Sequence, residues 1–384
     1  MRVGIYIPVL ESMPAGLGVY IFEVVSRILK LHPDCVVFTQ HPQNTPDWLI
    51  SASVLGCRLP FSSEVGQTGF LGRLNRLLWL NTFAHLNFKK HYVAVIFCPV
   101  QEGALFTSVA QVSVVHDLTA LRFPKSFSRI HVIFTKFYFS RSIKKSMKTI
   151  CVSKSTQNDV VKLLNIPTGE TSVIYEGFDH ALFFPPSRNE VCEVTSTYSL
   201  TEKYFFYSGT FSPHKNLVTA LYAFARVKKQ LPDMEFVLTG NRDSRDCQLF
   251  LKVATDLGVQ GSIKVLGYVP RQHLRALMGG SVAYVFPSLF EGFGLAPLEA
   301  LACGVSVISS DAGSLPEVIG EGGFLLPPLD VDAWVEKMID LAMQSVNPDF
   351  CAKQKEKALA QASKFSWDVA VNEILVILNQ ASKM

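Results

Sequence analysis

The sequence lacks the features that mark several common classes of protein. No apolar run reaches the roughly 18 to 20 residues of a membrane-spanning helix. The first residues do not show the basic, apolar and small-residue zones of a signal peptide. The eight cysteines are scattered, without a C-x-x-C pair or paired histidines, so a zinc site and a disulfide framework are disfavoured. We therefore expect a soluble protein of the reducing cytoplasm.

Two common catalytic patterns are also missing. The stretch PAGLGVY at 14–20 is not the G-x-G-x-x-G of a dinucleotide site. The second expected strand ends at 38–40 without the acidic residue that holds a nicotinamide ribose. There is no nucleophile elbow and no Ser-His-Asp order. Dehydrogenase and hydrolase chemistry are therefore disfavoured.

The sequence does have length, apolar residues and an uneven charge. With 384 residues, 48% of them hydrophobic, it can form two to three domains of about 150 residues. The net charge is +4, yet residues 1–180 hold 18 basic against 11 acidic residues, and the remainder 18 against 21. Within 71–148 there are 12 basic residues against only Glu102 and Asp117. This positive excess is the first indication of a partner.

Short β-branched or aromatic runs recur, each followed by a helix-length amphipathic stretch, which is the pattern of parallel βα units. The runs are 3–8, 35–39, 93–98, 111–115, 149–152 and 172–175, then 204–209, 235–240, 263–267, 282–287, 305–310 and 324–326. Continuous apolar runs predict strands buried on both faces of a sheet. We predict an α/β protein of two doubly wound domains, with ligands at the carboxyl ends of the strands and in the cleft between the domains.

The polar, proline-containing segment between the two sets of strands is interpreted as the interdomain linker. It is placed at 184–201, after a first domain of 1–183 and before a second of 202–364. The amphipathic stretch at 365–378 is predicted as a helix with Ser366 as its N-cap.

The most informative stretch is PSLFEGFGLAPLEALACG at 287–304. Glu291 falls in the loop after a strand, and Gly292 and Gly294 allow close backbone approach. The amides that follow, with the dipole of the next helix, make an anion site suited to a phosphate or diphosphate. Glu299 is expected in the first turn of that helix, where its carboxylate can accept hydrogen bonds from a ribose diol. The alternative is a glycine-rich turn whose glutamate only favours the helix dipole.

A second anion site is predicted at SGTFSPHKNL, 208–217. Ser212 as N-cap and Pro213 at the first helical position put Lys215 in the first turn of the next helix. A cation there opposes the helix dipole, so an anion opposite it explains its presence better. Lys215 is the better phosphate ligand, with His214 beside it. The alternative is a lysine that points into water.

His116 and Asp117 end the run SVVHDL at the carboxyl end of a strand. A functional histidine and a packed or capping one are equally compatible with this position.

Three further patterns are given structural interpretations. Asp330 and Asp332 have a spacing that some metal-dependent transferases use, but Asp332 is expected to cap a helix, so no metal site is predicted. Ser314 has the capping-box spacing to a glutamate, and Ser153 is a further expected N-cap.

Together these motifs resemble a known family. Glu291 and Glu299 have seven residues between them in EGFGLAPLE, accompanied by GTFSPHKN, VLGYVP and ALACGVSVISSDAGSLPEVIG. This closely resembles the retaining nucleotide-sugar glycosyltransferases of family 4, which have the GT-B fold. The resemblance covers nearly the whole chain and is most specific in 204–330. In the first domain only PAGLGVY, SVVHDL and CVSKSTQNDV correspond.

The resemblance implies two Rossmann-like domains facing a cleft, the first binding the acceptor and the second the nucleotide-sugar donor. A C-terminal helix within 365–384 is then expected to cross back to the first domain. It also implies a metal-independent hexosyltransferase with no cofactor, whose co-substrate is a nucleotide diphosphate sugar and whose acceptor is a saccharide or lipid-linked saccharide. Mannose from GDP-mannose is slightly favoured by the HDL and GTFSPHKN regions.

Carried over by position, the resemblance makes Glu291, His116 and Lys215 the catalytic residues. Lys215 would hold the donor diphosphate, Glu291 would contact the transferred sugar, and His116 would lie near that sugar. Glu299 would bind the ribose hydroxyls. The other expected donor-site positions are Gly16, Gly18, Gly209, Thr210, His214, Gly267, Tyr268, Val269, Gly292, Phe293, Gly294 and Leu295.

One departure from the family pattern concerns the donor diphosphate. Many members carry an arginine where this chain has Thr210. Diphosphate binding is then expected to rest on Lys215 with His214, or on Arg271 or another basic side chain. Two alternative functions stay open: a catalytically weak nucleotide-sugar-binding subunit, and a GT-B sugar-nucleotide epimerase.

The basic segments at 71–91 and 128–148 combine aromatic and aliphatic residues with arginine and lysine. That is the composition of an interfacial helix on anionic lipid. We expect peripheral attachment to the inner face of the cytoplasmic membrane and no nucleic-acid partner. The alternative is core packing with a solvated basic face.

Overall fold

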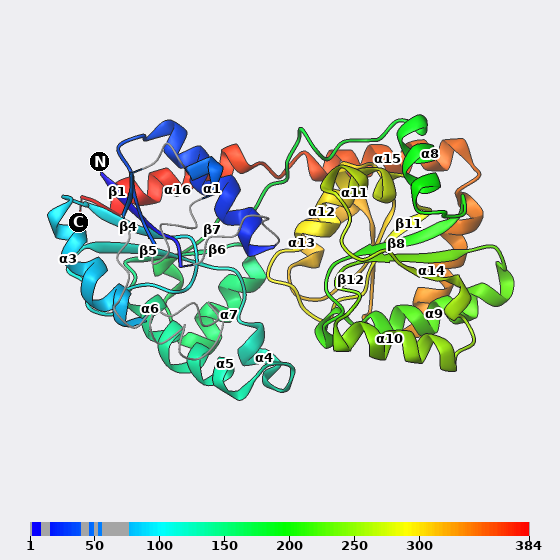
Figure 1. Cartoon of the computed structure of the whole chain (residues 1–384), viewed down its shortest axis with the longest axis horizontal. Coiled ribbons are helices and arrows are strands. Elements are labelled where there is room, and N and C mark those ends of the chain that lie inside the picture. The colour runs from blue at the N-terminus through cyan, green and yellow to red at the C-terminus, as the bar shows by residue number, and fades with distance from the viewer. Residues whose placement is uncertain (1, 9–15, 40–45, 50–52, 56–76, 384) are drawn as a thin grey trace. The chain divides into compact units, whose positions relative to one another are not determined.

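The apolar runs form two parallel sheets in the computed structural model of the chain, which describes residues 2–8, 16–39, 46–49, 53–55 and 77–383 (Figure 1). The chain divides into two units. Unit 1 is Met1–Glu176 together with Ser366–Met384, and unit 2 is Gly177–Phe365. Each unit has a doubly wound α/β architecture, as predicted.

The described strands of unit 1 form a parallel sheet in the order β3-β2-β1-β4-β5-β6-β7. They are β1 (Val3–Tyr6), β2 (Val36–Phe38), β3 (Ser53–Leu55), β4 (Val95–Cys98), β5 (Ala110–Val115), β6 (Lys148–Cys151) and β7 (Thr171–Val173). The strand β3 was not predicted, because its three residues form no apolar run. The order reverses between β1 and β4, which places the ligand-binding end of this sheet beside those two strands.

The described helices of unit 1 are α1 (Leu17–Leu31), α3 (His85–Lys90), α4 (Thr119–Arg122), α5 (Arg129–Phe134), α6 (Ser140–Lys145), α7 (Lys154–Leu164) and α16 (Trp367–Ala381). Short 3-10 or π turns lie at η2 (Asp47–Leu49), η3 (Leu80–Ala84), η4 (Pro124–Ser126), η5 (Thr135–Phe139) and η6 (Thr168–Glu170). The Ser153 hydroxyl caps α7 by accepting from the Thr156 amide, as predicted.

The C-terminal helix α16 belongs to unit 1, which confirms the predicted return to the first domain. It runs beside α1 (Figure 1), where Arg27 Nε donates to Asp368 Oδ1 at 2.7 Å. Trp367 is buried edge-on against Tyr20, with ring centroids 5.6 Å apart. Ser366 is the N-cap of α16, as the sequence predicted.

The described strands of unit 2 form a parallel sheet in the order β10-β9-β8-β11-β12-β13. They are β8 (Tyr204–Ser208), β9 (Glu235–Thr239), β10 (Ile263–Val265), β11 (Ala283–Phe286), β12 (Val307–Ser310) and β13 (Phe324–Leu326). The four strands β8, β9, β11 and β12 are buried along their whole length, as their apolar runs predicted. Here the order reverses between β8 and β11.

The described helices of unit 2 are α8 (Arg188–Thr197), α9 (Leu217–Gln230), α10 (Arg245–Asp256), α11 (Arg271–Gly279), α12 (Leu295–Ala302), α13 (Leu315–Ile319), α14 (Val331–Gln344) and α15 (Pro348–Ala362). Short 3-10 turns lie at η7 (Pro213–Lys215), η8 (Gln260–Ser262) and η9 (Gly320–Gly322).

The segment interpreted as a linker, 184–201, carries α8 and lies within unit 2. Ser187 and Glu190 form a capping box at the start of this helix. Glu190 also pairs with Arg275, whose guanidinium lies 3.9 Å from the centre of the Phe184 ring. The polar composition therefore reflects helix capping and surface exposure, and the division between the units falls earlier, between Glu176 and Gly177.

Candidate functional site

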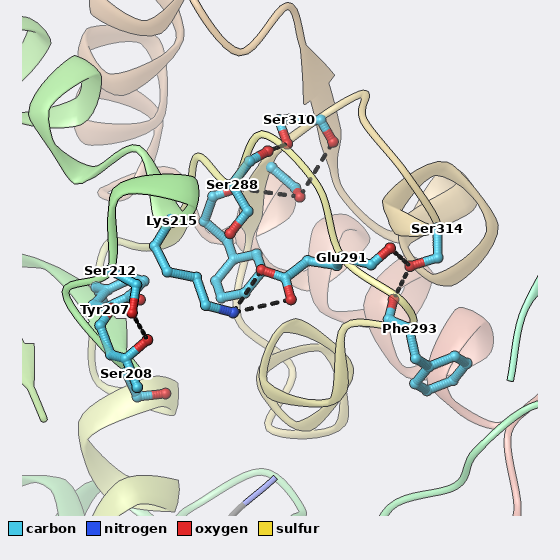
Figure 2. A network of polar contacts seen from close by, with 12 residues as sticks. Tyr207, Ser208, Ser212, Lys215, Ser288, Glu291, Phe293, Ser310 and Ser314 are labelled. Carbon is cyan, nitrogen blue, oxygen red and sulfur yellow. Dashed lines mark hydrogen bonds and ion pairs between the residues drawn. The ribbon is translucent and has the colours of Figure 1, made fainter. Parts of the chain in front are cut away.

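Two loops of unit 2 meet where the strand order of its sheet reverses. The strands β8 and β11 are neighbours there, with Phe205 paired to Ala283. Lys215 Nζ, from the loop after β8, lies 2.7 Å from Oε1 and 2.9 Å from Oε2 of Glu291, from the loop after β11 (Figure 2). It also lies 5.5 Å from the centre of the Phe286 ring. Because open α/β sheets bind ligands at this point, the pair marks the candidate site.

Ser212 and Pro213 occupy the predicted N-cap and first positions, but of the 3-10 turn η7, which Lys215 ends. Lys215 therefore lies in a helical turn as predicted, although it precedes the α-helix α9. The reason is Asn216, which adopts the left-handed conformation with φ 53° and serves as the N-cap of α9. Its Nδ2 donates to the carbonyl oxygens of Pro287, at 3.0 Å, and Pro328, at 2.7 Å. Asn216 thus fixes the backbone from which the lysine side chain extends.

The Glu291 loop leads into α12 through Gly294, which is the N-cap of this helix and has φ 112°. A side chain is strained at this φ, so glycine allows the sharp entry. Glu299 is the fifth residue of α12 and lies in its second turn, not in the first as predicted. Its buried carboxylate lies 3.7 Å from a guanidinium nitrogen of Arg271, the first residue of α11. Both glutamates of the motif therefore face a cation.

Ser314 does not form the predicted capping box. It occupies the N-cap position of α13, but its side chain makes no capping hydrogen bond. Its hydroxyl instead lies 2.5 Å from the carbonyl oxygen of Phe293 and 3.1 Å from that of Glu291, in the neighbouring loop (Figure 2). The serine thus serves the candidate site, through the backbone of the loop that carries Glu291.

The remaining predicted positions after β8 surround Lys215. Gly209 follows the strand, and Thr210 is exposed, with its hydroxyl 3.2 Å from that of Ser212. The carbonyl oxygen of His214 accepts from the Leu289 amide at 2.8 Å, a further bond between the two loops. Tyr207 is buried beneath them, and this burial, reinforced by Tyr284 and Glu291, raises the pKa of its phenol well above the ordinary value.

The other predicted donor positions lie on two further loops. Gly267, Tyr268 and Val269 follow β10, and the Tyr268 side chain is 83% exposed. Gly292 and Phe293 belong to the Glu291 loop, and Leu295 is the first residue of α12.

In unit 1, His116 follows β5 and is largely buried. Its Nε2 lies 3.0 Å from the carbonyl oxygen of Pro99, and its Nδ1 lies 3.4 Å from Oε1 of Glu176. Tyr20 contacts it edge-on, with ring centroids 4.6 Å apart. A neutral imidazole has one N–H, so only the doubly protonated ring donates to both acceptors.

The glycines near the start of the chain lie at the beginning of α1, where Gly16 is the N-cap and Gly18 is in the first turn. The rest of the predicted loop, 14–15, lies outside the described residues.

The described part of the chain contains no group of three or more His, Cys, Asp or Glu side chains suited to a metal ion. Asp330, and not Asp332 as predicted, caps α14; Asp332 pairs with Arg226.

Sequence reasoning missed several residues of the site. Asn216 and Ser314 act through partners far away in the sequence, and no local pattern points to those partners. Glu176 had a usable signal, since it follows β7 at the same edge of the sheet that drew attention to His116.

Comparisons with known proteins identify a family and several relatives. The family model "Glycosyl transferases group 1" matches residues 196–361. The O-antigen chain mannosyltransferase B of Escherichia coli is 32% identical over 267 residues, which is 67% of each chain. The serotype-specific mannosyltransferase WbdA of the same organism is 28% identical over 242 residues, 61% of this chain but only 29% of that longer protein.

Among solved structures, the HepE protein of Anabaena in complex with UDP and glucose matches with a TM-score of 0.75. The identity is 18%, and the match covers 99% of each chain. At this identity the likeness concerns the fold, and it confirms the predicted two-domain, Rossmann-like GT-B architecture.

Proposed function

The chain belongs to the family of glycosyl transferases group 1, and we propose that it moves mannose from GDP-mannose to a saccharide or lipid-linked saccharide acceptor. The observation that carries this proposal is the Lys215–Glu291 pair where the strand order of unit 2 reverses. The names of two relatives, both mannosyltransferases, support mannose as the sugar. The neighbour solved with UDP and glucose supports a nucleoside diphosphate sugar as the class of donor.

The proposed chemistry separates charge. When the bond from the anomeric carbon to phosphate breaks, positive charge grows on the sugar and negative charge on the leaving diphosphate. The Lys215 ammonium and the amides at the start of α12 stabilise the leaving group, and fixed charges of this kind cost little reorganisation during the reaction. The Glu291 carboxylate stabilises the sugar, and Glu299 binds the ribose. Donor binding then brings a diphosphate to the lysine that pairs with Glu291.

We propose that the reaction retains the anomeric configuration, by same-face attack or through a covalent intermediate. We also propose that it needs no metal ion, because Lys215 and the α12 amides supply the positive potential that a metal would otherwise provide. Proton NMR of the anomeric signal of the product tests retention. Activity that persists after EDTA treatment tests metal independence, and loss of activity that Mg²⁺ or Mn²⁺ restores would overturn it.

The donor is identified by ligand-induced stabilisation and then by turnover. A ligand present at a hundredfold excess over its Kd stabilises the folded state by about 2.7 kcal/mol. We expect GDP-mannose to raise the Tm more than UDP-glucose or ADP-glucose, and to release GDP only when a saccharide acceptor is present. Binding without turnover under a panel of acceptors favours the binding-subunit alternative suggested by Thr210. Interconversion of free donor sugars without acceptor favours the epimerase.

We further propose that unit 1 attaches to an anionic membrane surface through one helical face. None of the helices in the described part of the chain has both the length and the apolar character needed to span a bilayer. The run α5-η5-α6 does, however, expose three large apolar side chains, Ile130 at 50%, Ile133 at 57% and Phe137 at 51%. These three define what we call the apolar stripe.

Basic side chains surround the apolar stripe. The exposed ones along this run are Arg129, Lys136, Arg141, Lys144 and Lys145. The Arg141 guanidinium lies 5.7 Å from the centre of the Phe137 ring. No acidic residue occurs between Asp117 and Asp159. An apolar stripe flanked by cations suits an anionic bilayer, where each basic residue contributes up to about 1 kcal/mol. Of the other basic segment, 71–91, the residues 71–76 lie outside the described chain.

Co-sedimentation with vesicles tests the attachment. We expect binding to phosphatidylglycerol vesicles at low salt, weaker binding to phosphatidylcholine, and a loss of roughly tenfold in affinity for Ile133→Glu. The matched control is Val376→Glu on α16 of the same unit, where the native side chain is 56% exposed. Absence of wild-type binding at low salt, or an equal loss in both variants, would overturn the proposed attachment without touching the donor chemistry.

A further inference from the structure

Three neighbouring strand ends of unit 2 meet at Glu291. The strands β8, β11 and β12 lie side by side in the sheet. The loop after β8 supplies Lys215, the loop after β11 supplies Glu291, and the loop after β12 supplies Gly313 and Ser314. The middle loop is therefore held from both sides: its carboxylate by the lysine, and its backbone by the third loop (Figure 2).

The contacts from Ser314 converge on the Glu291 loop. The hydroxyl lies within hydrogen-bond distance of two carbonyl oxygens, those of Phe293 at 2.5 Å and Glu291 at 3.1 Å. The backbone N–H of Ser314 donates to the same Glu291 oxygen at 3.3 Å. Serine at a helix N-cap usually accepts a hydrogen bond from its own helix, but no such bond is made at α13. The side chain therefore holds the neighbouring loop at the expense of its own helix.

Gly313, the residue before Ser314, packs against the backbone of the same loop. Its φ is 61°, a left-handed conformation that side chains rarely adopt. A Cβ on this residue would lie 2.7 Å from the carbonyl oxygen and 2.9 Å from the nitrogen of Glu291. The backbones of the two loops are packed so closely that only glycine fits between them.

We propose that Gly313 and Ser314 are positioning residues for the transfer reaction. They hold the backbone of 291–293 so that the Glu291 carboxylate faces Lys215 and the donor sugar. The inference rests on the proposed function only in the statement that Glu291 meets the sugar. Small displacements matter here, because a misplacement of about 1 Å in a reacting group can lower a rate roughly a hundredfold.

The chain offers a matched control for Ser314→Ala. Ser288 lies on the same loop as Glu291 and is fully buried, yet its hydroxyl has no hydrogen-bond partner among the described residues. Its carbonyl oxygen accepts from the Ser310 hydroxyl, a bond that Ser288→Ala leaves in place. Both substitutions remove one buried hydroxyl, but only one of these hydroxyls holds the loop.

The experiment has a kinetic and a structural arm. With GDP-mannose and a saccharide acceptor, we expect Ser314→Ala and Gly313→Ala each to lower kcat roughly 10- to 100-fold with a smaller change in KM. Ser288→Ala should stay within about twofold of wild type. In a Glu291→Gln background, Ser314→Ala should lower kcat by no more than about twofold further, because residues that act as a unit are not additive. A full additional loss in that background would overturn the proposal, since the serine would then act independently of Glu291.

Hydrogen exchange separates this proposal from the proposed function. We expect the peptide 287–297 to exchange faster in Ser314→Ala and Gly313→Ala than in wild type or Ser288→Ala, in the absence of any ligand. If wild type fails to turn over any donor, the proposed transfer is wrong, and the exchange data still decide whether the third loop holds this peptide. Unchanged exchange in both variants would overturn the positioning role.

Discussion

The two units share one architecture but carry different chemistry near the point where their strand order reverses. In unit 2 the loops after β8 and β11 bring the Lys215 ammonium to the Glu291 carboxylate. In unit 1 the loop after β5 brings His116 to the carbonyl oxygen of Pro99 and to the buried Glu176. Both arrangements connect loops of one sheet, but the first pairs a lysine with a carboxylate, whereas the second joins an imidazole to a backbone carbonyl oxygen and a carboxylate. The proposed charge stabilisation therefore rests on residues of unit 2.

The same contrast explains the uneven charge of the chain. Residues 1–180 have the positive excess, and part of it is the group of exposed cations around the apolar stripe, along α5, η5 and α6. The second half is slightly acidic, but two of its cations face glutamates of the stretch 287–304: Lys215 faces Glu291, and Arg271 faces Glu299. In the proposed function, the few cations that face glutamates of unit 2 serve the reaction, and the many exposed cations of unit 1 favour contact with an anionic membrane surface.

The largest expected effect tests whether the two units are separate folding units. Trp367→Ala in unit 1 and Trp334→Ala in unit 2 each remove a fully buried ring, which typically costs about 3–5 kcal/mol. We expect each variant to lower the hydrogen-exchange protection of its own unit, read from peptides covering β5 and β8. Loss of protection in β8 for Trp367→Ala would contradict the assignment of α16 to unit 1.

The next effect concerns catalysis in unit 2. Glu291→Ala should lower turnover roughly 10²- to 10³-fold, about 2.7–4 kcal/mol, while nucleotide binding is kept, because the carboxylate acts on the sugar. Lys215→Ala should lower turnover to a similar extent and also weaken GDP binding, because it removes the cation that faces the diphosphate. Isothermal titration with GDP and a GDP-release assay measure the two quantities.

A control for these variants is an ion pair of the same unit that lies on α14. Asp340→Ala breaks the pair between Lys337 and Asp340. Turnover and GDP affinity within about twofold of wild type are expected. If Glu291→Ala behaved like this control, the proposed chemistry at β8 and β11 would be wrong.

The features that could be predicted from the sequence are those that depend on local pattern. Largely apolar runs identified every described strand of unit 2, and four of these strands, β8, β9, β11 and β12, are buried on both faces. Glu291, Gly294 and Lys215 were placed on the correct loops, because loops that follow parallel strands lie at one edge of the sheet. The strand β3 was missed, since its three residues carry no such pattern.

The features that could not be predicted depend on contacts between distant segments. Lys215 precedes its helix because Asn216 bonds the carbonyl oxygens of Pro287 and Pro328, more than 70 residues away. The spacing at Ser314 predicted a capping box, but its hydroxyl instead bonds a loop 21 residues earlier in the chain. Spacing within a segment predicts what a side chain can do locally, and it carries no information about a competing partner from another loop.

The smallest effect is expected at His116, and it decides whether the contrast between the units holds. His116→Ala leaves the Glu176 carboxylate, which is 6% exposed, without its imidazole partner, and we expect a loss of about 1–3 kcal/mol in the stability of unit 1. Turnover should fall by no more than roughly tenfold, or 1.4 kcal/mol, because the ring is already engaged by Pro99 and Glu176. Urea unfolding and the GDP-release assay measure these effects. A loss of turnover as large as that of Glu291→Ala, with stability unchanged, would mean that unit 1 also contributes directly to the reaction. His116 would then belong beside Lys215 and Glu291 as a catalytic residue.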